Sequence, residues 1–434
     1  MIVSVVLSDL GVDARTRFEP GGAWFFSSVG RSWQMVERSA PEAAGSDRRI
    51  LPRTSRPMPD AIRLLEELPP HRLAGEIVRL AQEAAGCPVA LYVVDIGGSA
   101  LRRMAGQTPL PDDIPIPQVL GPQLSRGRMR ELQDTVAETY ANAVAYPLWV
   151  FGRAVAVLIT ESQPAEALEP LARQAAAAFE LADQYTDEIR RARRRRRPAP
   201  GAEIQDNLVR PRLAELEGAE IAAAIVPAYD VGGDWYDYAQ NHDGIWFAIA
   251  DAVGKGAVAA AASAVALGAL RSSRAARDDL QATAEAMDRV IKELSELRTQ
   301  FSTAILGHFD PVTGAAAWLR LGHPVPLLVD ASGGVTELET PGNPPLGVLA
   351  PDEALQVTER VLAPGEQLIL TSDGVWERRT SSGELFGFNG IKRAIATRTN
   401  TTAAATGTAL VTAIAQAAAS PPSDDATVLV LAKA

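Results

Sequence analysis

Aspartates beside apolar runs are the side chains of this sequence best suited to chemistry. Three runs of β-forming residues begin or end in aspartate, and a fourth aspartate follows two glycines: in chain order these are Asp234, Asp251, Asp373 and the pair Asp424 and Asp425. Each one alone has an ordinary explanation, because Asp-Gly is common in turns and aspartate often caps a helix. Their repetition at predicted strand ends favours a shared site.

A shared site of this kind indicates a divalent cation. If the strands are neighbours in sheets, their ends bring the carboxylates to one rim, where the negative charges repel unless a cation neutralises them. Oxygen ligands without histidine or cysteine select Mg²⁺ or Mn²⁺. One cysteine, Cys87, and four scattered histidines cannot supply a zinc site.

The composition narrows the remaining function classes. The 434 residues allow two or three domains, and 47% of them are apolar, as in an ordinary globular protein. A single cysteine excludes an intrachain disulfide and suits a reducing compartment, and a net charge of −11 argues against nucleic-acid binding. The chain starts without a signal-peptide pattern and its longest apolar stretch, Ala257–Leu270, is short for a membrane span, so we expect a cytoplasmic protein.

The elements that must position the aspartates lie in the second half of the chain, after a differently patterned first half. We expect an N-terminal segment of uncertain fold plus a proline- and arginine-rich linker (1–60), an α+β domain (61–165), a helical linker (166–202) and the aspartate-bearing domain (203–434).

The pattern of residues 61–165 predicts helices around two hairpins. The expected elements are a helix at Leu73–Ala85, strands at Val89–Val94 and Leu101–Met104, and a hairpin of Ala143–Val150 with Arg153–Thr160. This order resembles a GAF domain, which implies a sensor for a small molecule or a protein signal. An α+β domain without a ligand has the same pattern.

The predicted helix from about Glu166 to Arg197 has apolar residues at the spacing of a coiled-coil seam, namely Leu168, Leu171, Ala175, Ala178, Ala182, Tyr185 and Ile189. We expect a parallel homodimer through this seam, although a helix packed on its own domain would look similar. Its arginine-rich end suggests an anionic partner or, alternatively, cations that complement the helix C-terminus before a proline stop.

The second half resembles the PPM-type metal-dependent protein phosphatases, in particular the bacterial SpoIIE/RsbU-like branch. The resemblance extends over residues 204–431 and follows the family's order of motifs. The resembling segments are Glu203–Leu208, Pro227–Asp237, Asp251–Ala260, Phe301–Asp310, Gly322–Leu328, Pro345–Val348, Thr371–Glu377, Gly383–Gly387 and Asp424–Val430.

This resemblance implies a sandwich of two antiparallel β-sheets flanked by α-helices, with two Mn²⁺ or Mg²⁺ ions at one end. By resemblance, Asp251 bridges the ions, the carbonyl of Ala252 helps to hold one, Asp373 and Asp424 hold the other, and Asp234 positions metal-bound water. The family pattern favours Asp424, and Asp425 is the alternative. The implied reaction is direct attack of activated water on phosphoserine or phosphothreonine.

Some positions depart from the family's patterns. Val253 stands where eukaryotic relatives have a histidine that is a candidate proton donor, so the donor is unassigned, and Ala250 and Val253 stand where the bacterial branch often has Gly and Ser. We expect His323 to be structural. Gly-Gly-Asp also occurs in diguanylate cyclases, where Glu-Phe follows it. Trp235 and Tyr236 follow it here, so we reject that function. The competing function is a catalytically silent scaffold, which retention of all four carboxylates argues against.

By resemblance, the expected substrate is a phosphorylated STAS-domain anti-anti-sigma protein on a separate chain. The GAF-like domain would receive an unknown signal and regulate the phosphatase through the helix between them. No nucleic acid and no membrane span are expected among the partners.

Overall fold

The chain divides into two units, Met1–Pro57 and Met58–Ala434. The computed structural model describes residues 68–140, 142–160, 166–194, 200–227, 233–295, 301–350, 354–418 and 424–434, with the backbone alone of 24–29 and 32–37. In the first unit, β1 (Trp24–Val29) and β2 (Ser32–Glu37) form an antiparallel pair. The linker predicted to end near residue 60 lies outside the described residues.

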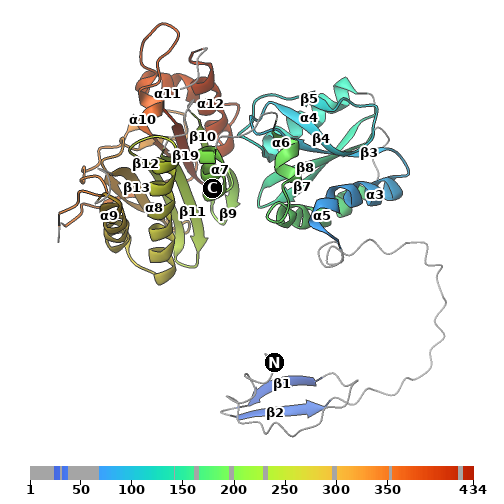
Figure 1. Cartoon of the computed structure of the whole chain (residues 1–434), viewed down its shortest axis with the longest axis horizontal. Helices are drawn as coiled ribbons and strands as arrows, with labels where there is room; N and C mark the ends of the chain where they lie inside the picture. The colour runs from blue at the N-terminus through green and yellow to red at the C-terminus, as the bar shows by residue number, and fades with distance from the viewer. Residues whose placement is uncertain are drawn as a thin grey trace. The chain divides into compact units, whose positions relative to one another are not determined.

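One antiparallel sheet with helices on both faces makes up the first part of the second unit (Figure 1). The strand order is β5-β4-β3-β8-β6, and β7 also pairs with β8. The elements are η1 (Pro70–Arg72), α3 (Leu73–Ala85), β3 (Val89–Val94), β4 (Ala100–Gly106), β5 (Asp113–Pro115), β6 (Leu124–Ser125), α4 (Arg126–Thr139), β7 (Val144–Val150), β8 (Arg153–Thr160), α5 (Leu168–Ala182) and α6 (Glu188–Arg193).

The helix and strands predicted for this part are confirmed, and local chemistry explains their ends. Helix α3 ends at Gly86, whose φ of 67° is a left-handed cap that favours glycine. Strand β3 is buried along its whole length because alternate side chains enter two cores, one shared with α3 and α5 and the other with α4. The GAF assignment itself stays a prediction.

The prediction of one helix from residue 166 to the end of the arginine run is wrong. The chain forms α5 and a separate short α6, with a break between Ala182 and Glu188. The predicted seam side chains of α5, and Ile189 of α6, are buried in the core of their own domain, whereas Tyr185 in the break is 76% exposed. The alternative of a helix packed on its own domain is therefore confirmed here, and the homodimer stays a prediction.

From α7 (Pro200–Leu208) onward the chain forms two antiparallel sheets. The six-stranded sheet has the order β16 (Val335–Glu337), β15 (Leu327–Val329), β18 (Gln367–Thr371), β19 (Ala426–Lys433), β10 (Ala219–Val226) and β9 (Leu213–Leu216). The five-stranded sheet has the order β11 (Asp234–Asn241), β12 (Gly244–Ala252), β13 (Ser302–Phe309), β14 (Ala315–Leu321) and β17 (Thr358–Val361).

The two sheets pack face to face, and helices cover their outer faces. A shared core takes Tyr236, Phe247 and Trp318 from one sheet and Ile221, Leu370 and Leu429 from the other. Helices α8 (Ala257–Ala276) and α9 (Leu280–Ser295) cover the five-stranded sheet, and α11 (Gly387–Ala396) and α12 (Ala403–Gln416) cover the six-stranded sheet (Figure 1). The expected helix-flanked sandwich is confirmed.

No helix in the described ranges combines the length and the apolar character that crossing a membrane requires.

Candidate active site

The hairpin of β11 and β12 places two of the predicted aspartates side by side. Asp234 begins β11 and Asp251 lies near the end of β12, and the two residues are direct partners in the ladder. The side chains of Asp234, Tyr236 and Tyr238 alternate with their neighbours toward the other sheet, and Asp234 is only 3% exposed. A two-residue turn at the far end of the hairpin therefore fixes which aspartates meet.

The six-stranded sheet brings the other predicted aspartates to its edge in the same way. Asp373 follows β18 and opens the short helix α10 (Asp373–Trp376), and Asp424 and Asp425 precede the adjacent strand β19. Ser372 joins the end of β18 to the start of β19: its N–H donates to the Thr427 carbonyl (3.0 Å), and its Oγ accepts from the Thr427 N–H (2.9 Å).

Hydrogen bonds between the sheets join the two pairs of strand ends. The hydroxyl of Thr427 donates to Oδ2 of Asp234. Nε2 of Gln205 on α7 donates to the carbonyl of Asp234 (2.8 Å) and to Oδ2 of Asp425 (2.9 Å). The start of β11 in one sheet and the start of β19 in the other are thus held together where the carboxylates lie.

Burial and the charges of neighbouring carboxylates raise the pKa of three of these aspartates: Asp234, Asp251 and Asp373. Burial, followed by the charge of Asp373, raises the pKa of Asp251 to about 7, and Asp424 and Asp425 add to the shift. Burial raises the pKa of Asp234 well above its usual value; the charge of Asp251 adds to this, while the hydrogen bond from Thr427 opposes it. Burial and the charge of Asp424 likewise raise the pKa of Asp373.

This electrostatic strain fits a hard divalent cation. The donors are carboxylate oxygens, which Mg²⁺ and Mn²⁺ prefer, and a cation would relieve the repulsion that raises these pKa values. Among the described residues, no three His, Cys, Asp or Glu side chains form a group arranged to hold a metal ion. The assignment of Asp251, Ala252, Asp373 and Asp424 as ligands therefore stays a prediction.

Two glycines allow the backbone to close around the carboxylates. A Cβ on Gly233 would lie 2.1 Å from the Ala252 carbonyl oxygen, and one on Gly374 would lie 2.0 Å from the Asp425 carbonyl oxygen. Neither distance is compatible with a side chain. Ser263 on α8 also donates to the Gly233 carbonyl at 2.5 Å, which fixes this turn against the helix.

Asp237 belongs to the same sequence motif as Asp234 but faces the other way. Its carboxylate is fully buried beneath α8 and pairs with Arg271 (2.7 Å), Arg274 (2.9 Å) and Arg210 (3.3 Å). A buried carboxylate needs such partners, so Asp237 is structural.

His323 is also structural in its geometry, as the sequence predicts. The ring is 1% exposed and its Nδ1 lies 2.8 Å from the hydroxyl of Thr303, the strand partner of Asp251. Burial lowers the pKa of His323 to about 3, so the ring is neutral at physiological pH.

Three polar residues at the site carry no role in the sequence-based assignment: Gln205, Ser372 and Thr427. Each lies inside a segment that resembles a family motif. The resemblance therefore indicated the segment, but it did not indicate a role for the individual residue. Asp425, the alternative to Asp424, is 1% exposed and bound by Gln205, whereas Asp424 is half-buried and accepts from the Asp425 N–H at 3.0 Å.

Comparison with known proteins gives the following similarities. The family model described as Stage II sporulation protein E (SpoIIE) matches residues 241–433. Phosphoserine phosphatase RsbU of Bacillus subtilis is 28% identical over 191 residues, which is 42% of this chain and 54% of RsbU. Protein IcfG of Synechocystis is 25% identical over 215 residues, which is 43% of this chain and 33% of IcfG. The chain thus spans about half of RsbU and a third of IcfG.

Two solved structures are also similar to this chain. A structure of RsbU and RsbW domains from Mycobacterium tuberculosis is 27% identical with a TM-score of 0.43, and the match covers 50% of this chain and 61% of that one. The phosphatase domain of B. subtilis SpoIIE with a regulatory fragment is 16% identical with a TM-score of 0.43, over 70% and 75% of the two chains. Residues 241–433 of this chain are therefore similar to the SpoIIE family, and the RsbU relative is described as a phosphoserine phosphatase.

Proposed function

We propose that residues 203–434 form a protein serine/threonine phosphatase that uses two Mn²⁺ or Mg²⁺ ions. The observation that carries the proposal is that Asp234 and Asp251 are ladder partners in one sheet, while Asp373 and Asp424 lie at the ends of neighbouring strands of the other sheet, to which Thr427 links Asp234 by a hydrogen bond. The RsbU relative, described as a phosphoserine phosphatase, supports the same substrate class.

In this proposal each aspartate has a separate task. Asp251 and the Ala252 carbonyl, together with Asp373 and Asp424, would hold the ions, and the charges of Asp373 and Asp424 already raise the pKa of Asp251. Asp234, held by Thr427, orients the attacking water. When bound, the ions lower the pKa of water and neutralise charge on the phosphoryl group.

We propose that His323 does not supply the proton for the leaving alkoxide. Its ring is buried and neutral, because burial lowers its pKa to about 3. Val253, at the position of the family's candidate acid, has no proton to give. We therefore propose that solvent protonates the leaving group.

Hydrolysis of p-nitrophenyl phosphate and of a phosphoserine peptide, with Mn²⁺ and with excess EDTA, tests the proposal. Wild type should turn over both substrates only with the metal, and Asp251→Asn should lower kcat by about 100-fold or more. Asp243→Asn is the matched control, because Asp243 is exposed in the turn at the opposite end of the same hairpin. A folded wild type with no turnover in any divalent metal would instead establish a silent scaffold.

The proposed physiological substrate is a phosphorylated STAS-domain anti-anti-sigma protein. This rests on the resemblance to the SpoIIE/RsbU-like branch. Incubating the enzyme with phosphorylated STAS proteins from the same genome tests it. Loss of phosphate from unrelated phosphoproteins, with all STAS proteins left intact, would contradict it.

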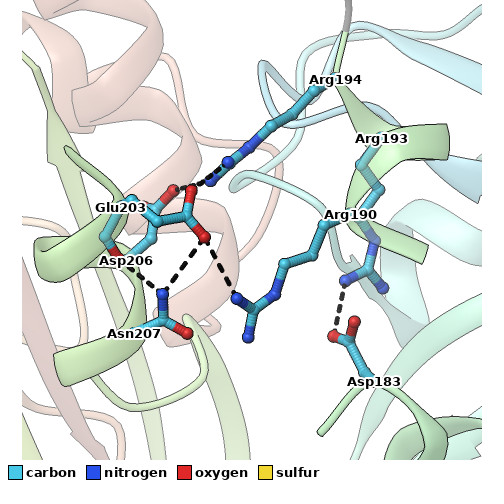
Figure 2. A network of polar contacts seen from close by, with 7 residues as sticks. All are labelled: Asp183, Arg190, Arg193, Arg194, Glu203, Asp206 and Asn207. Carbon is cyan, nitrogen blue, oxygen red and sulfur yellow. Dashed lines mark hydrogen bonds and ion pairs between the residues drawn. The ribbon is translucent and has the colours of Figure 1, made fainter. Parts of the chain in front are cut away.

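We further propose that the N-terminal part, a GAF-like sensor at 61–165, regulates the phosphatase through α6 and α7. Figure 2 shows the polar contacts that support this: Arg190 and Arg194 on the α6 side reach Glu203 on α7, and Arg194 also reaches Asp206 at 2.8 Å. Arg193 instead pairs with Asp183 of its own domain at 3.4 Å. Described arginines of the basic run thus have acidic partners within the chain.

Two variants of full-length protein test this link. Arg194→Ala removes the contacts to Glu203 and Asp206, and it should change Mn²⁺-dependent turnover. Arg191→Ala is the matched control, because among the residues that the structure describes Arg191 pairs with its helix neighbour Glu188, at 2.7 Å. If both variants match wild type in kcat, KM and metal affinity, the segment is a tether and the regulatory proposal fails.

A homodimer, a GAF ligand and a cytoplasmic location complete the proposal. Sedimentation of the full chain measures the first. A dimer through the predicted seam would need α5 to leave its own core, since those side chains are buried there.

A further inference from the structure

Gln205 is a buried amide that the proposed chemistry does not yet use. It lies on α7, outside the segment that matches the family model, and only 8% of the residue is exposed. Its Nε2 donates both hydrogens: one to the backbone carbonyl of Asp234 (2.8 Å) and one to Oδ2 of Asp425 (2.9 Å). A buried amide with this pattern costs free energy unless its partners are fixed, and here both partners belong to the carboxylate end of the sandwich.

The two acceptors come from different sheets. Asp234 begins β11 in the five-stranded sheet, and Asp425 immediately precedes β19 in the six-stranded sheet. A single amide group therefore sets the separation of the two strand ends. Of the ordinary side chains, glutamine suits this task because its planar NH₂ group carries two donors and no charge. An ionised glutamate has no hydrogen to donate to these two oxygen acceptors. The side chain of asparagine is one methylene shorter than that of glutamine.

The position of Asp425 is transmitted to Asp424. The N–H of Asp425 donates to Oδ1 of Asp424 at 3.0 Å, so the amide that holds the Asp425 carboxylate also holds the peptide that orients Asp424. On the other side, the Asp234 carbonyl bound by Gln205 and the Asp234 carboxylate bound by Thr427 fix that residue at both ends.

We propose that Gln205 is a positioning residue for this site: it holds Asp234 and the Asp424–Asp425 pair at the separation that divalent cations and water require. The proposal rests on the proposed phosphatase function. Gln205 acts through Asp234 and Asp425 and does not contact the substrate in this proposal. Outer partners of this kind typically change metal affinity or activity by about 10- to 100-fold when removed.

The test compares Gln205→Ala and Gln205→Glu with wild type, using full-length protein. Three quantities are measured: Mn²⁺ affinity by titration calorimetry, kcat and KM with a phosphoserine peptide, and the midpoint of thermal unfolding. Asn207→Ala is the matched control on the same helix, because within the described part of the chain the Asn207 side chain bonds to Glu203 alone, at 2.6 and 3.3 Å.

A positioning role predicts that both Gln205 variants lose about tenfold or more in Mn²⁺ affinity and in kcat, with KM within about twofold of wild type. Gln205→Glu should lose more than Gln205→Ala, because it adds a negative charge beside Asp425. Asn207→Ala should match wild type. Variants that melt earlier but keep wild-type kcat and Mn²⁺ affinity overturn this inference alone. A wild type that neither binds Mn²⁺ nor turns over substrate overturns the proposed function and the inference with it.

Discussion

The hydroxyl of Thr427 donates a hydrogen bond to the buried carboxylate of Asp234, and this contact joins the two sheets at the carboxylate cluster. Thr427 belongs to β19 of the six-stranded sheet, and Asp234 begins β11 of the five-stranded sheet. The bond also opposes the rise in the pKa of Asp234 that burial causes. One hydroxyl thus affects both the geometry and the charge state of the site.

Thr427→Val should lower kcat by about 10- to 100-fold and leave KM nearly unchanged, because Asp234 loses its orienting partner and its pKa rises further. Steady-state kinetics with p-nitrophenyl phosphate and saturating Mn²⁺ measure this. Thr336→Val is the matched control, since Thr336 is exposed on the short strand β16. Equal kcat in Thr427→Val and wild type would show that the hydrogen bond has no part in turnover.

Asp251→Asn should reduce kcat by about 100-fold or more, the scale seen when a group that stabilises transition-state charge is removed. The reason is that Asp251 is the ladder partner of Asp234, and burial and the charges of Asp373, Asp424 and Asp425 raise its pKa. Asp243→Asn should retain wild-type kcat. Substantial turnover by Asp251→Asn in Mn²⁺ would contradict the proposed two-ion arrangement.

Stability of the metal-free protein should fall as the pH rises from about 4 to about 7. The folded state raises the pKa of Asp251 to about 7, above its unfolded value, so the folded state holds this proton over that window and loses the benefit as the pH increases. This group contributes a slope of at most about 1.4 kcal/mol per pH unit. Urea unfolding in EDTA measures it, and Asp251→Asn should flatten the slope. Identical slopes in the two proteins would exclude Asp251 as the source.

Gly233→Ala and Gly374→Ala should each destabilise the fold by about 1 to 3 kcal/mol and abolish turnover, because the new Cβ would overlap a backbone carbonyl at the site. Gly268→Ala is the control, since this glycine lies on α8 with open space around its Cβ position. That variant should be more stable than wild type by about 0.5 to 1 kcal/mol. Thermal melts and kcat measure both effects, and unchanged melting of the two site variants would refute the close approach.

The His323 ring should not titrate between pH 5 and pH 8. Its burial lowers the pKa to about 3, whereas a histidine in a reference peptide has a pKa of about 6.5. NMR of ¹⁵N-labelled histidine, with His323→Gln to assign the resonance, measures this. A His323 resonance that shifts with a midpoint near neutrality would restore the ring as a candidate proton donor.

The sequence determined which residues are candidates and which elements carry them. The apolar runs predicted the strands next to Asp251, Asp373 and Asp424, and the helix-flanked sandwich followed from the resemblance. Asp234 was expected in a glycine turn, whereas it begins strand β11. These inferences succeed because strand ends and turns are local, and local pattern sets them.

The tertiary structure decided which of those residues meet. Asp234 and Asp237 occupy the same motif, yet strand alternation turns one toward the other sheet and the other toward the arginines of α8. The break between α5 and α6 was likewise not predicted from the sequence. The same spacing of apolar residues is expected whether the helix packs on a partner helix or on its own domain, as it does here. Gln205 shows the same limit, since its partners Asp234 and Asp425 lie 29 and 220 residues away. Contacts at such separations depend on how the sheets pack, which local spacing does not encode.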